Sequence, residues 1–381
     1  MIFPRSENVQ LSKIRDIYNR ASPGCIDLGI GIPYCSTPSS VKERVYSAVL
    51  KNYTRYTHTR GIPELREAVA RRYNQEFNVN ITSDNVLITC GAAEAVFISM
   101  FSLLRGKDEA LIPDPGYPAY PAVAKLLEAE PVPYTLSIEN QFGIQAEEIL
   151  SKINSYTKIL LLNSPSNPTG GINNKTELKK IAEYLKDNEK ICVISDQIYS
   201  RLNYSHNPVT SLSDYLDLDN IILISGVSKE FSMTGFRIGW AVSSEKNISE
   251  LSKTHLYQVS CAPSLSQWAA VEALHSGSEE VKQYMLHNRN EMLNELKKVT
   301  HLNYIIPQAG LYFFVDVSQY GSGDEICNKL LKEAEVITIP GSGFGKAGTD
   351  YIRLSFGTSP DKIKEGMKRL QKFFNSKSKD S

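Results

Sequence analysis

The stretch that decides the fold is residues 225–240, SGVSKEFSMTGFRIGW, in which an apolar run ends in small residues. A single lysine, Lys229, follows that run, and Gly235 and Arg237 come next. A lysine most often lies in a solvated loop. A lysine placed just beyond a buried strand can instead react with the carbonyl group of a cofactor. The rest of the chain decides between these two interpretations.

Composition and charge limit the classes of protein to which the chain can belong. Its 381 residues are 41% hydrophobic, with 42 basic and 42 acidic side chains, which is typical of a globular protein of enzyme size. Zero net charge argues against nucleic acid or an anionic membrane as a partner, because both bind basic surfaces. No apolar stretch is long enough to span a bilayer. The six scattered cysteines lack the spacing of a disulfide framework or metal site, so we expect a cytoplasmic protein without a bound metal.

Short apolar runs alternate with amphipathic segments between Ser83 and Ser243. The runs are VLITC, ALIP, EPVPYTL, KILLLN, CVIS, NIILIS and IGWAV. Several are continuously apolar, as expected of strands that are buried on both faces of a parallel sheet. We therefore predict an α/β fold with a mostly parallel central sheet and helices on both faces.

The pattern changes after about residue 275. A long charged helical segment leads to the strand LYFFVDV, the helix EICNKLLKEA, the strands VITIP and YIRLSF, and a final helix. This order is typical of a smaller α+β domain. We predict a large domain at 48–275 and a small domain formed by 1–47 and 276–381.

Residues directly after the strands are the candidate ligand contacts, because open α/β sheets bind ligands at the carboxyl ends of their strands. Gly91–Ala93 begin a helical segment, where backbone amides can hold an anion or simply form a tight turn. Tyr117 lies in the loop DPGYPAYP and can stack on a flat ring or cap a core. Asn167 in SPSNPTG is part of a strong turn signal and can also donate a hydrogen bond to a phenolate oxygen.

Charged residues also follow the strands. Asp196 ends an apolar run, where a carboxylate is costly unless it meets a cation; it is either a helix N-cap or the counter-ion of a protonated ring nitrogen. Ser228 and Arg237 flank the lysine and can bind a phosphate group. Arg353 lies inside the apolar strand YIRLSFG, where it forms a structural salt bridge or binds a planar anion.

The order of these signals resembles the class I/II aminotransferases, pyridoxal-phosphate enzymes of fold type I in the aspartate aminotransferase superfamily. The resemblance extends from about Ile26 to about Arg369. It depends on eight motifs: LGIGIP, YTHTRGIPELREAVA, TCGAAEAV, PDPGYPAY, NSPSNPTG, SDQIY, SKEFSMTGFRIGW and PGSGFGKAGTDYIRLSFG. It implies fold type I, a pyridoxal 5'-phosphate cofactor and a homodimer.

The resemblance also implies roles for individual residues. Lys229 would bind the cofactor covalently and move the substrate proton, and Asp196 would keep the pyridine nitrogen protonated. Arg353 would bind the substrate α-carboxylate, with help from the Gly31 backbone and Asn167. Tyr56 matches a tyrosine that this family contributes to the phosphate of the neighbouring subunit. The other implied cofactor contacts are Gly91, Ala92, Ala93, Tyr117, Asn167, Tyr199, Ser228 and Arg237, and Tyr199 would also tune the reactive group.

The resemblance implies transfer of an amino group from an L-amino acid to a 2-oxo acid by a ping-pong mechanism. A β-lyase of the same fold is an alternative, and a cofactor-sensing module without turnover is a third, which the lack of a basic DNA-binding segment disfavours. The sequence assigns no second arginine to a side-chain carboxylate. The tyrosine-rich entrance favours aromatic or other apolar substrate side chains, and the physiological donor and acceptor stay open.

Overall fold

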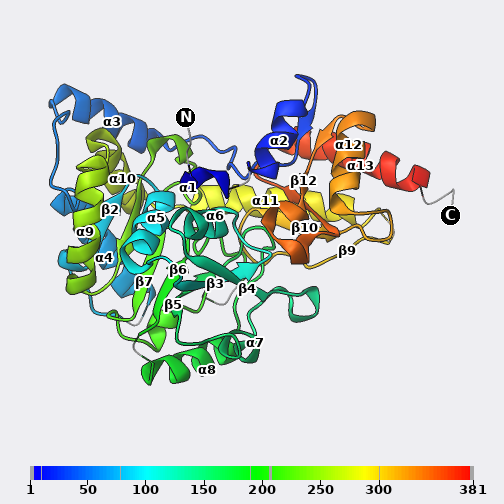
Figure 1. Cartoon of the computed structure of the whole chain (residues 1–381). Coiled ribbons are helices and arrows are strands. Elements are labelled where there is room, and N and C mark those ends of the chain that lie inside the picture. The colour runs from blue at the N-terminus through cyan, green and yellow to red at the C-terminus, as the bar shows by residue number, and fades with distance from the viewer. Residues whose placement is uncertain are drawn as a thin grey trace.

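The computed structural model places the helices and strands in layers around two main β-sheets, of seven and four strands, and a third sheet has two strands (Figure 1). It describes residues 4–9, 11–77, 79–188, 190–205, 208–299 and 301–377. Residues 1–3 and 378–381 of the predicted small domain lie outside this described part. In the described part, no helix has both the length and the apolar character that crossing a bilayer requires.

The larger sheet has seven strands and contains the apolar runs seen in the sequence. Only β8 runs antiparallel to its neighbours, so the sheet is mostly parallel, as predicted. From one edge to the other, the strands are β2 (Val86–Thr89), β8 (Gly239–Val242), β7 (Ile221–Gly226), β6 (Cys192–Asp196), β5 (Thr157–Asn163), β3 (Glu109–Asp114) and β4 (Glu130–Thr135).

Both faces of the sheet are buried along its central strands, which explains why these strands are mostly apolar, whereas the edge strand β4 is partly exposed. In β5, Ile159 and Leu161 belong to one core cluster, while Leu160 and Leu162 belong to the cluster on the opposite face. The first face packs on α5 (Ala92–Leu103), α6 (Ala119–Leu126) and α9 (Glu245–Val259). The second face packs on α3 (Ser39–Leu50), α4 (Pro63–Glu76), α8 (Lys175–Lys186) and α10 (Ser264–Ser276).

The smaller sheet is antiparallel and has its own core. Its strands, in order, are β12 (Ile339–Pro340), β13 (Tyr351–Ser355), β10 (Tyr312–Asp316) and β9 (Asn303–Tyr304). Nearby helices are α2 (Lys13–Arg20), α11 (Glu279–Leu296), α12 (Gly323–Glu333) and α13 (Pro360–Lys377). The short helices α1 (Pro4–Glu7) and α7 (Ala146–Leu150) complete the set of described α-helices.

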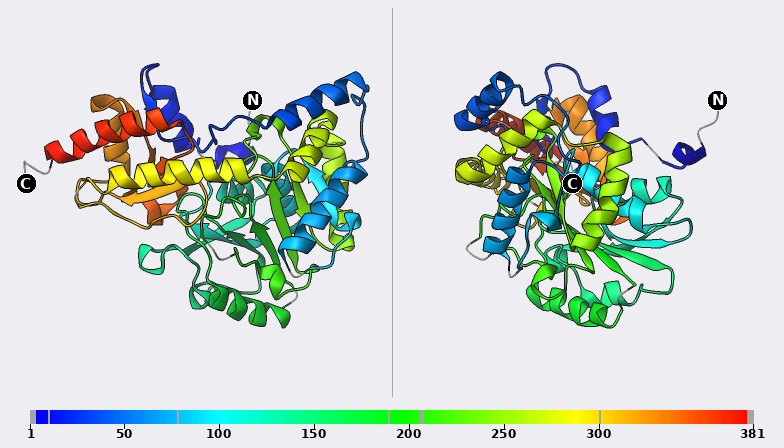
Figure 2. Two further views of the ribbon diagram at one scale, coloured as in Figure 1. Left: turned by 180° about the vertical axis from the view of Figure 1, so that it is seen from behind. Right: turned by 90° about the vertical axis from the view of Figure 1, so that its left-hand side faces the viewer.

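An early and a late segment of the chain pair in a separate two-stranded sheet. The early strand β1 (Ile26–Asp27) pairs in parallel with the late strand β11 (Val336–Ile337). The views of Figure 1 and Figure 2 agree that α2, near the N-terminus, lies beside α12 and α13. In Figure 2, α11 extends from the large sheet toward the small one. The exact domain boundaries at 47/48 and 275/276 stay a prediction.

The sheet topology explains where a ligand can bind. The chain runs from β3 outward to β4 and then returns to β5 on the other side of β3. Such a reversal opens a crevice at the carboxyl ends of the strands, and the loops after β3, β5, β6 and β7 border it.

Candidate active site

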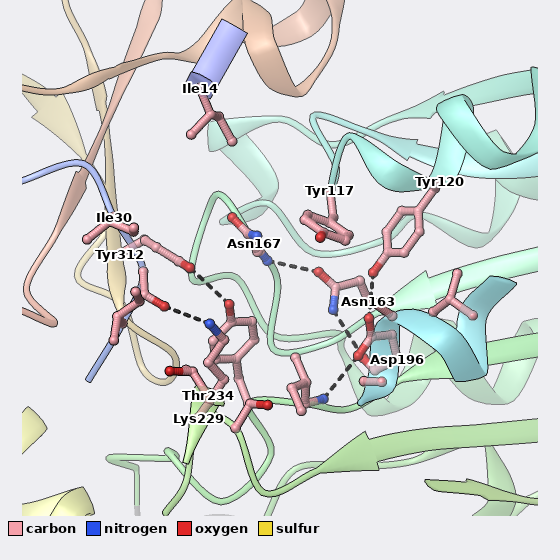
Figure 3. A pocket seen from close by; sticks show the side chains of 18 of the residues that line it. Ile14, Ile30, Tyr117, Tyr120, Asn163, Asn167, Asp196, Lys229, Thr234 and Tyr312 are labelled. Carbon is pink, nitrogen blue, oxygen red and sulfur yellow. Dashed lines mark hydrogen bonds between the residues drawn. The ribbon is translucent and has the colours of Figure 1, made fainter. Parts of the chain in front are cut away.

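A cavity of about 420 Å³ lies at the carboxyl ends of these strands and reaches the smaller sheet (Figure 3). The structure brings most of the residues predicted from the sequence together in its lining. Those residues are Gly31, Ala92, Ala93, Tyr117, Asn167, Asp196, Tyr199, Ser228, Lys229, Arg237 and Arg353. Gly91 and Tyr56 do not line it.

Asp196 is the last residue of β6, and its carboxylate is buried at the base of the cavity. The Tyr120 hydroxyl donates to Oδ2 at 2.8 Å, and the Ile198 amide donates to Oδ1 at 3.1 Å. Desolvation raises the pKa of Asp196 to about 6, although both hydrogen bonds and the Lys229 charge act in the opposite direction. The carboxylate therefore favours a cationic partner in the cavity, because an adjacent positive charge stabilises its ionised form.

Lys229 lies three residues beyond β7, on the wall opposite this carboxylate (Figure 3). Its Nζ donates to the carbonyl oxygen of Gly31 at 2.7 Å, which ties the lysine to the N-terminal segment of the chain. Burial lowers the pKa of Lys229, and the positive charges of Arg353 and Arg237 lower it further. A lysine with a lowered pKa is more often neutral, and only the neutral amine is a nucleophile or a base.

Backbone amides and a guanidinium group border one end of the cavity. The helix α5 begins at Ala92, so the amides of Ala92 and Ala93 are among the first N–H groups of a helix, which lack partners within it. Gly239 packs so closely against this turn that a Cβ atom there would lie 2.3 Å from the Ala92 nitrogen. Ser228 and Arg237 line the same cavity. This set of donors suits a phosphate group.

Arg353 lies in β13 and is 3% exposed, and the structure shows what holds it. Its Nη1 donates to Oδ1 of Asn167 at 2.8 Å, and its Nη2 donates to the carbonyl oxygen of Gly29 at 2.7 Å. The guanidinium carbon lies 4.2 Å from the ring centre of Tyr312 and 4.6 Å from that of Phe344. No carboxylate pairs with Arg353 among the described residues. The predicted alternative of a structural salt bridge is therefore not seen there, and the guanidinium remains available to an anionic ligand.

Four tyrosine side chains line the walls of the cavity. Tyr117 packs edge-on against Tyr120, with ring centres 5.4 Å apart. The hydroxyls of Tyr199 and Tyr312 lie 2.9 Å apart in a hydrogen bond. Burial raises the pKa of Tyr199 well above its ordinary value, and Tyr312 adds to this increase, so Tyr199 is a neutral phenol at physiological pH.

Several lining residues were missed in the sequence. Asn163 ends β5, and its side-chain oxygen accepts the Asn167 amide at 2.9 Å while its Nδ2 donates to the Asp196 carbonyl at 3.1 Å. The position of Asn163 at the end of an apolar strand could have identified it as a candidate from the sequence. Tyr120 is the second residue of α6 and belongs to the same tyrosine-containing motif, DPGYPAYP, as Tyr117, which could have identified it. Tyr312 and Arg15 had no local signal, because tertiary packing alone brings them to the cavity.

Tyr56 lies away from this cavity, and its side chain is 88% exposed. In a single chain, Tyr56 is therefore not part of the site. Its predicted role requires a second subunit and is considered below.

The residues present fit pyridoxal phosphate, on the evidence of the donor set. Phosphate donors border one end of the cavity, a buried carboxylate lies at the base, and a lysine with a lowered pKa lies on the opposite wall. A phosphorylated, protonated pyridine aldehyde presents the complementary groups.

Comparisons with known proteins agree with this arrangement. Residues 23–370 match the family model described as aminotransferase class I and II. The chain is 37% identical to an aspartate aminotransferase of Pyrococcus horikoshii, over 96% of this chain and 95% of that one. A solved aspartate aminotransferase from Thermotoga maritima superposes with a TM-score of 0.93 at 31% identity, covering 98% of this chain and all of that one. A solved aromatic aminotransferase from Pyrococcus horikoshii superposes with a TM-score of 0.88 at 28% identity, covering 96% and 99%.

The chain belongs to the class I and II aminotransferases, and its fold is fold type I. It is an enzyme that transfers an amino group from an amino acid to a 2-oxo acid, as the sequence predicted. None of these comparisons favours the β-lyase alternative.

Proposed function

We propose that the cavity binds pyridoxal 5'-phosphate and carries out transamination by a ping-pong route with Lys229 as the central residue. The observation that carries this proposal is the presence of Lys229, the Asp196 carboxylate and the phosphate donors in one cavity. When bound, the cofactor supplies an aldehyde that condenses with amines and a ring that accepts the electron pair left at the substrate Cα.

The protein residues hold this group and control one proton. Ala92, Ala93, Ser228 and Arg237 would hold the phosphate, with Gly91 giving the turn that exposes the two amides. The carboxylate of Asp196 would face the ring nitrogen and keep its proton in place.

The remaining ring contacts would come from side chains on the cavity walls. Tyr117 would stack on the ring, and Asn167 and Tyr199 would bind its phenolic oxygen. Lys229, whose pKa is lowered by burial, would take the proton from the substrate Cα and deliver it to the carbon of the cofactor's aldehyde group.

Arg353 would bind the substrate α-carboxylate. Its guanidinium is fixed by Asn167 and by the Gly29 carbonyl, and two aromatic rings border it. Its buried Nε has no hydrogen-bond partner among the described residues. The close approach of Gly31 to the Tyr312 hydroxyl, where a Cβ atom would overlap the oxygen, leaves the Gly31 backbone beside the place for substrate.

The charges of the cavity favour a substrate with a second carboxylate. Its lining includes Arg15, Lys229, Arg237 and Arg353 but a single carboxylate, Asp196. The proposed roles use every one of these charges except that of Arg15, which has no ion pair among the described residues. We therefore propose aspartate, glutamate and their 2-oxo acids as substrates, with Arg15 binding the side-chain carboxylate. The two relatives named aspartate aminotransferases support this choice.

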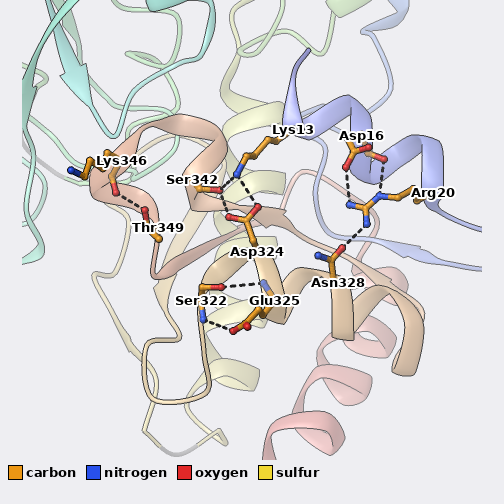
Figure 4. Close-up of polar contacts among 10 residues, drawn as sticks. All are labelled: Lys13, Asp16, Arg20, Ser322, Asp324, Glu325, Asn328, Ser342, Lys346 and Thr349. Atoms are coloured by element: carbon orange, nitrogen blue, oxygen red, sulfur yellow. Dashed lines mark hydrogen bonds and ion pairs between the residues drawn. The ribbon is translucent and has the colours of Figure 1, made fainter. Parts of the chain in front are cut away.

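The helix α2 presents Arg15 to the cavity because its other charged residues are held by the small sheet and its helices. Nζ of Lys13 donates to Asp324 at 2.9 Å and to Ser342 at 2.8 Å (Figure 4). Arg20 pairs with Asp16 at 2.9 Å on the same helix and bonds to Asn328 of α12. These contacts fix the rotation of α2 about its axis, and Arg15 and the neighbouring Ile14 line the cavity.

A panel of amino donors tests both transfer and the substrate class. Aspartate or glutamate should bleach the visible band of the bound cofactor in the wild-type enzyme, and a 2-oxo acid should restore it. Release of ammonia with an eliminated product would instead support a lyase. In Arg15→Gln, we expect kcat/KM for acidic donors to fall roughly tenfold to a hundredfold, since a hydrogen bond to a charged group contributes about 1.5–3 kcal/mol.

The matched control is phenylalanine, whose side chain carries no charge. Its kcat/KM should change less than about threefold in Arg15→Gln, and Arg15→Lys should retain part of the preference for acidic donors because the charge remains. Equal losses for acidic and aromatic donors would contradict a role for Arg15 in selecting the side chain.

We also propose that the enzyme is a homodimer with shared active sites. Tyr56 and several apolar residues on and near α3 are exposed in the single chain: Tyr46, Val49, Leu50 and Tyr53. Exposed apolar patches of this kind are typical of an interaction surface. Sedimentation velocity should give twice the 42.6 kDa chain mass, and a monomer with full activity would exclude a shared site.

We propose a cytoplasmic location. All six cysteines lie in the described residues and are free, which is consistent with a reducing compartment.

A further inference from the structure

A buried acid–histidine pair lies behind the turn that begins α5. Glu94 of α5 is 8% exposed, and His255 of α9 is fully buried. The Nδ1 atom of His255 lies 3.0 Å from Oε1 of Glu94, so the pair links the two helices. The roles proposed for the active site use neither residue.

The second oxygen of Glu94 reaches the phosphate-binding turn itself. It accepts the backbone amide of Cys90, and the carbonyl of that same residue accepts Nη2 of Arg237 at 3.3 Å. The Cys90 residue is thus held at its amide by a carboxylate and at its carbonyl by a guanidinium. Gly91 follows with φ of 88°, and a Cβ atom there would lie 2.5 Å from the Arg237 guanidinium.

The contacts of the turn determine the direction of the next amides. Because the Cys90 backbone is held at both ends, the orientation of the following residues, Ala92 and Ala93, is fixed before any anion binds. Prepositioned donors strengthen binding because less ordering is needed when the ligand arrives.

Burial of the polar Glu94–His255 pair costs folding free energy, and the ordering of the turn would explain why the pair is present. The buried part of the contact between α5 and α9 is otherwise apolar, with Ala95, Ile98, Ile248 and Leu251 in one core cluster, and an exposed hydrogen bond joins Ser102 to Thr254. Nε2 of His255 is buried without a hydrogen-bond partner among the described residues. An unsatisfied buried polar atom costs about 1–3 kcal/mol, so an apolar pair at these two positions would favour stability alone.

We propose that Glu94, held in place by His255, is a positioning residue for the backbone amides that bind the cofactor phosphate. This inference depends on the proposed function, since it assumes that the phosphate binds at the start of α5. Glu94 acts through the Cys90 amide and does not contact the cofactor, while His255 keeps the carboxylate directed at that amide.

The test measures phosphate binding separately from catalysis. The full-length protein is stripped of cofactor and titrated with pyridoxal phosphate, and the ³¹P NMR signal of the bound cofactor is recorded. In Glu94→Ala, we expect the dissociation constant to rise by about tenfold or more and the ³¹P shift to move, because the hydrogen bond from the Cys90 amide that orients the turn is lost. The visible absorption maximum should stay unchanged, since Lys229 and Asp196 are intact.

Three further variants make the result specific. Glu94→Gln should bind within about threefold of wild type, because its amide oxygen still accepts the Cys90 amide. His255→Ala should weaken binding in the same direction as Glu94→Ala. Ser99→Ala is the matched control: Ser99 is buried on the same helix, and among the described residues its hydroxyl donates only to the Ala95 carbonyl at 2.7 Å, so the affinity of this variant should equal that of wild type.

Wild-type affinity and an unchanged ³¹P shift in Glu94→Ala would overturn the inference. A loss of affinity in Ser99→Ala as large as in Glu94→Ala would also overturn it, since general weakening of α5 would then be the cause. If Glu94→Ala does not fold, His255→Ala decides in the same way. Failure of the wild-type protein to bind the cofactor would instead reject the proposed function.

Discussion

Replacing Lys229 with alanine should abolish multiple turnover and remove the covalent attachment of the cofactor. The substitution deletes both the amine that condenses with the aldehyde and the base that moves the Cα proton. Loss of a general base alone lowers kcat by about 10²–10⁴-fold. Steady-state assays with aspartate and 2-oxoglutarate measure the rate, and borohydride reduction followed by mass spectrometry measures the attachment.

Two variants separate the lysine from its surroundings. Lys229→Arg keeps the positive charge and should be as inactive as the alanine variant, because a guanidinium is always protonated and does not act as a base. Lys253→Ala removes an exposed lysine of α9 whose one ion pair within the described part of the chain is with Glu250, and this variant should retain wild-type activity. Sustained turnover by Lys229→Ala would exclude the proposed role.

Arg353→Ala should reduce kcat/KM by about 2–5 kcal/mol of transition-state binding, which is roughly 30-fold to several thousandfold. The large effect follows from burial: the guanidinium is 3% exposed, and removing it leaves the substrate carboxylate without a partner in a desolvated site. Kinetics with several donors should show a similar loss for each, because every amino acid carries the α-carboxylate.

Arg353→Lys separates the effect of the planar shape of the guanidinium from the effect of its positive charge. A lysine lacks the planar fork that bonds to Asn167 and the Gly29 carbonyl together, so we expect it to recover only a small part of the activity. The uniform loss expected for Arg353 contrasts with the selective loss expected for Arg15. An unchanged specificity constant in Arg353→Ala would mean that another residue binds the carboxylate.

Much of the fold could be predicted because the strands of a parallel sheet are buried on both faces. β5 and β7 are mostly apolar in sequence. A polar residue that ends β5 or follows β7 marks the carboxyl end of the strand. For the same reason, Asp196 and Lys229 were visible in the sequence as charges placed directly after apolar strands.

The remainder of the site depends on tertiary packing, which local patterns do not encode. Arg15 belongs to a short helix with charges on several sides, and only the contacts of Lys13 and Arg20 with α12 and its neighbours decide which charge meets the cavity. Glu94 and His255 are 161 positions apart in the sequence, so no local pattern predicts that they pair. Tyr56 is 88% exposed in a single chain, so its predicted role depends on the proposed second subunit.

The pairing of Lys229 with the Gly31 carbonyl, and of β1 with β11, has a consequence for biosynthesis. During translation, the amine-bearing loop emerges long before Arg353, and the early segment that contains Gly31 has no strand partner until β11 and β13 leave the ribosome. A nascent chain that ends before β13 therefore lacks Arg353, the group proposed to bind the substrate carboxylate. The proposed catalytic competence should arise only after β13 has been synthesised.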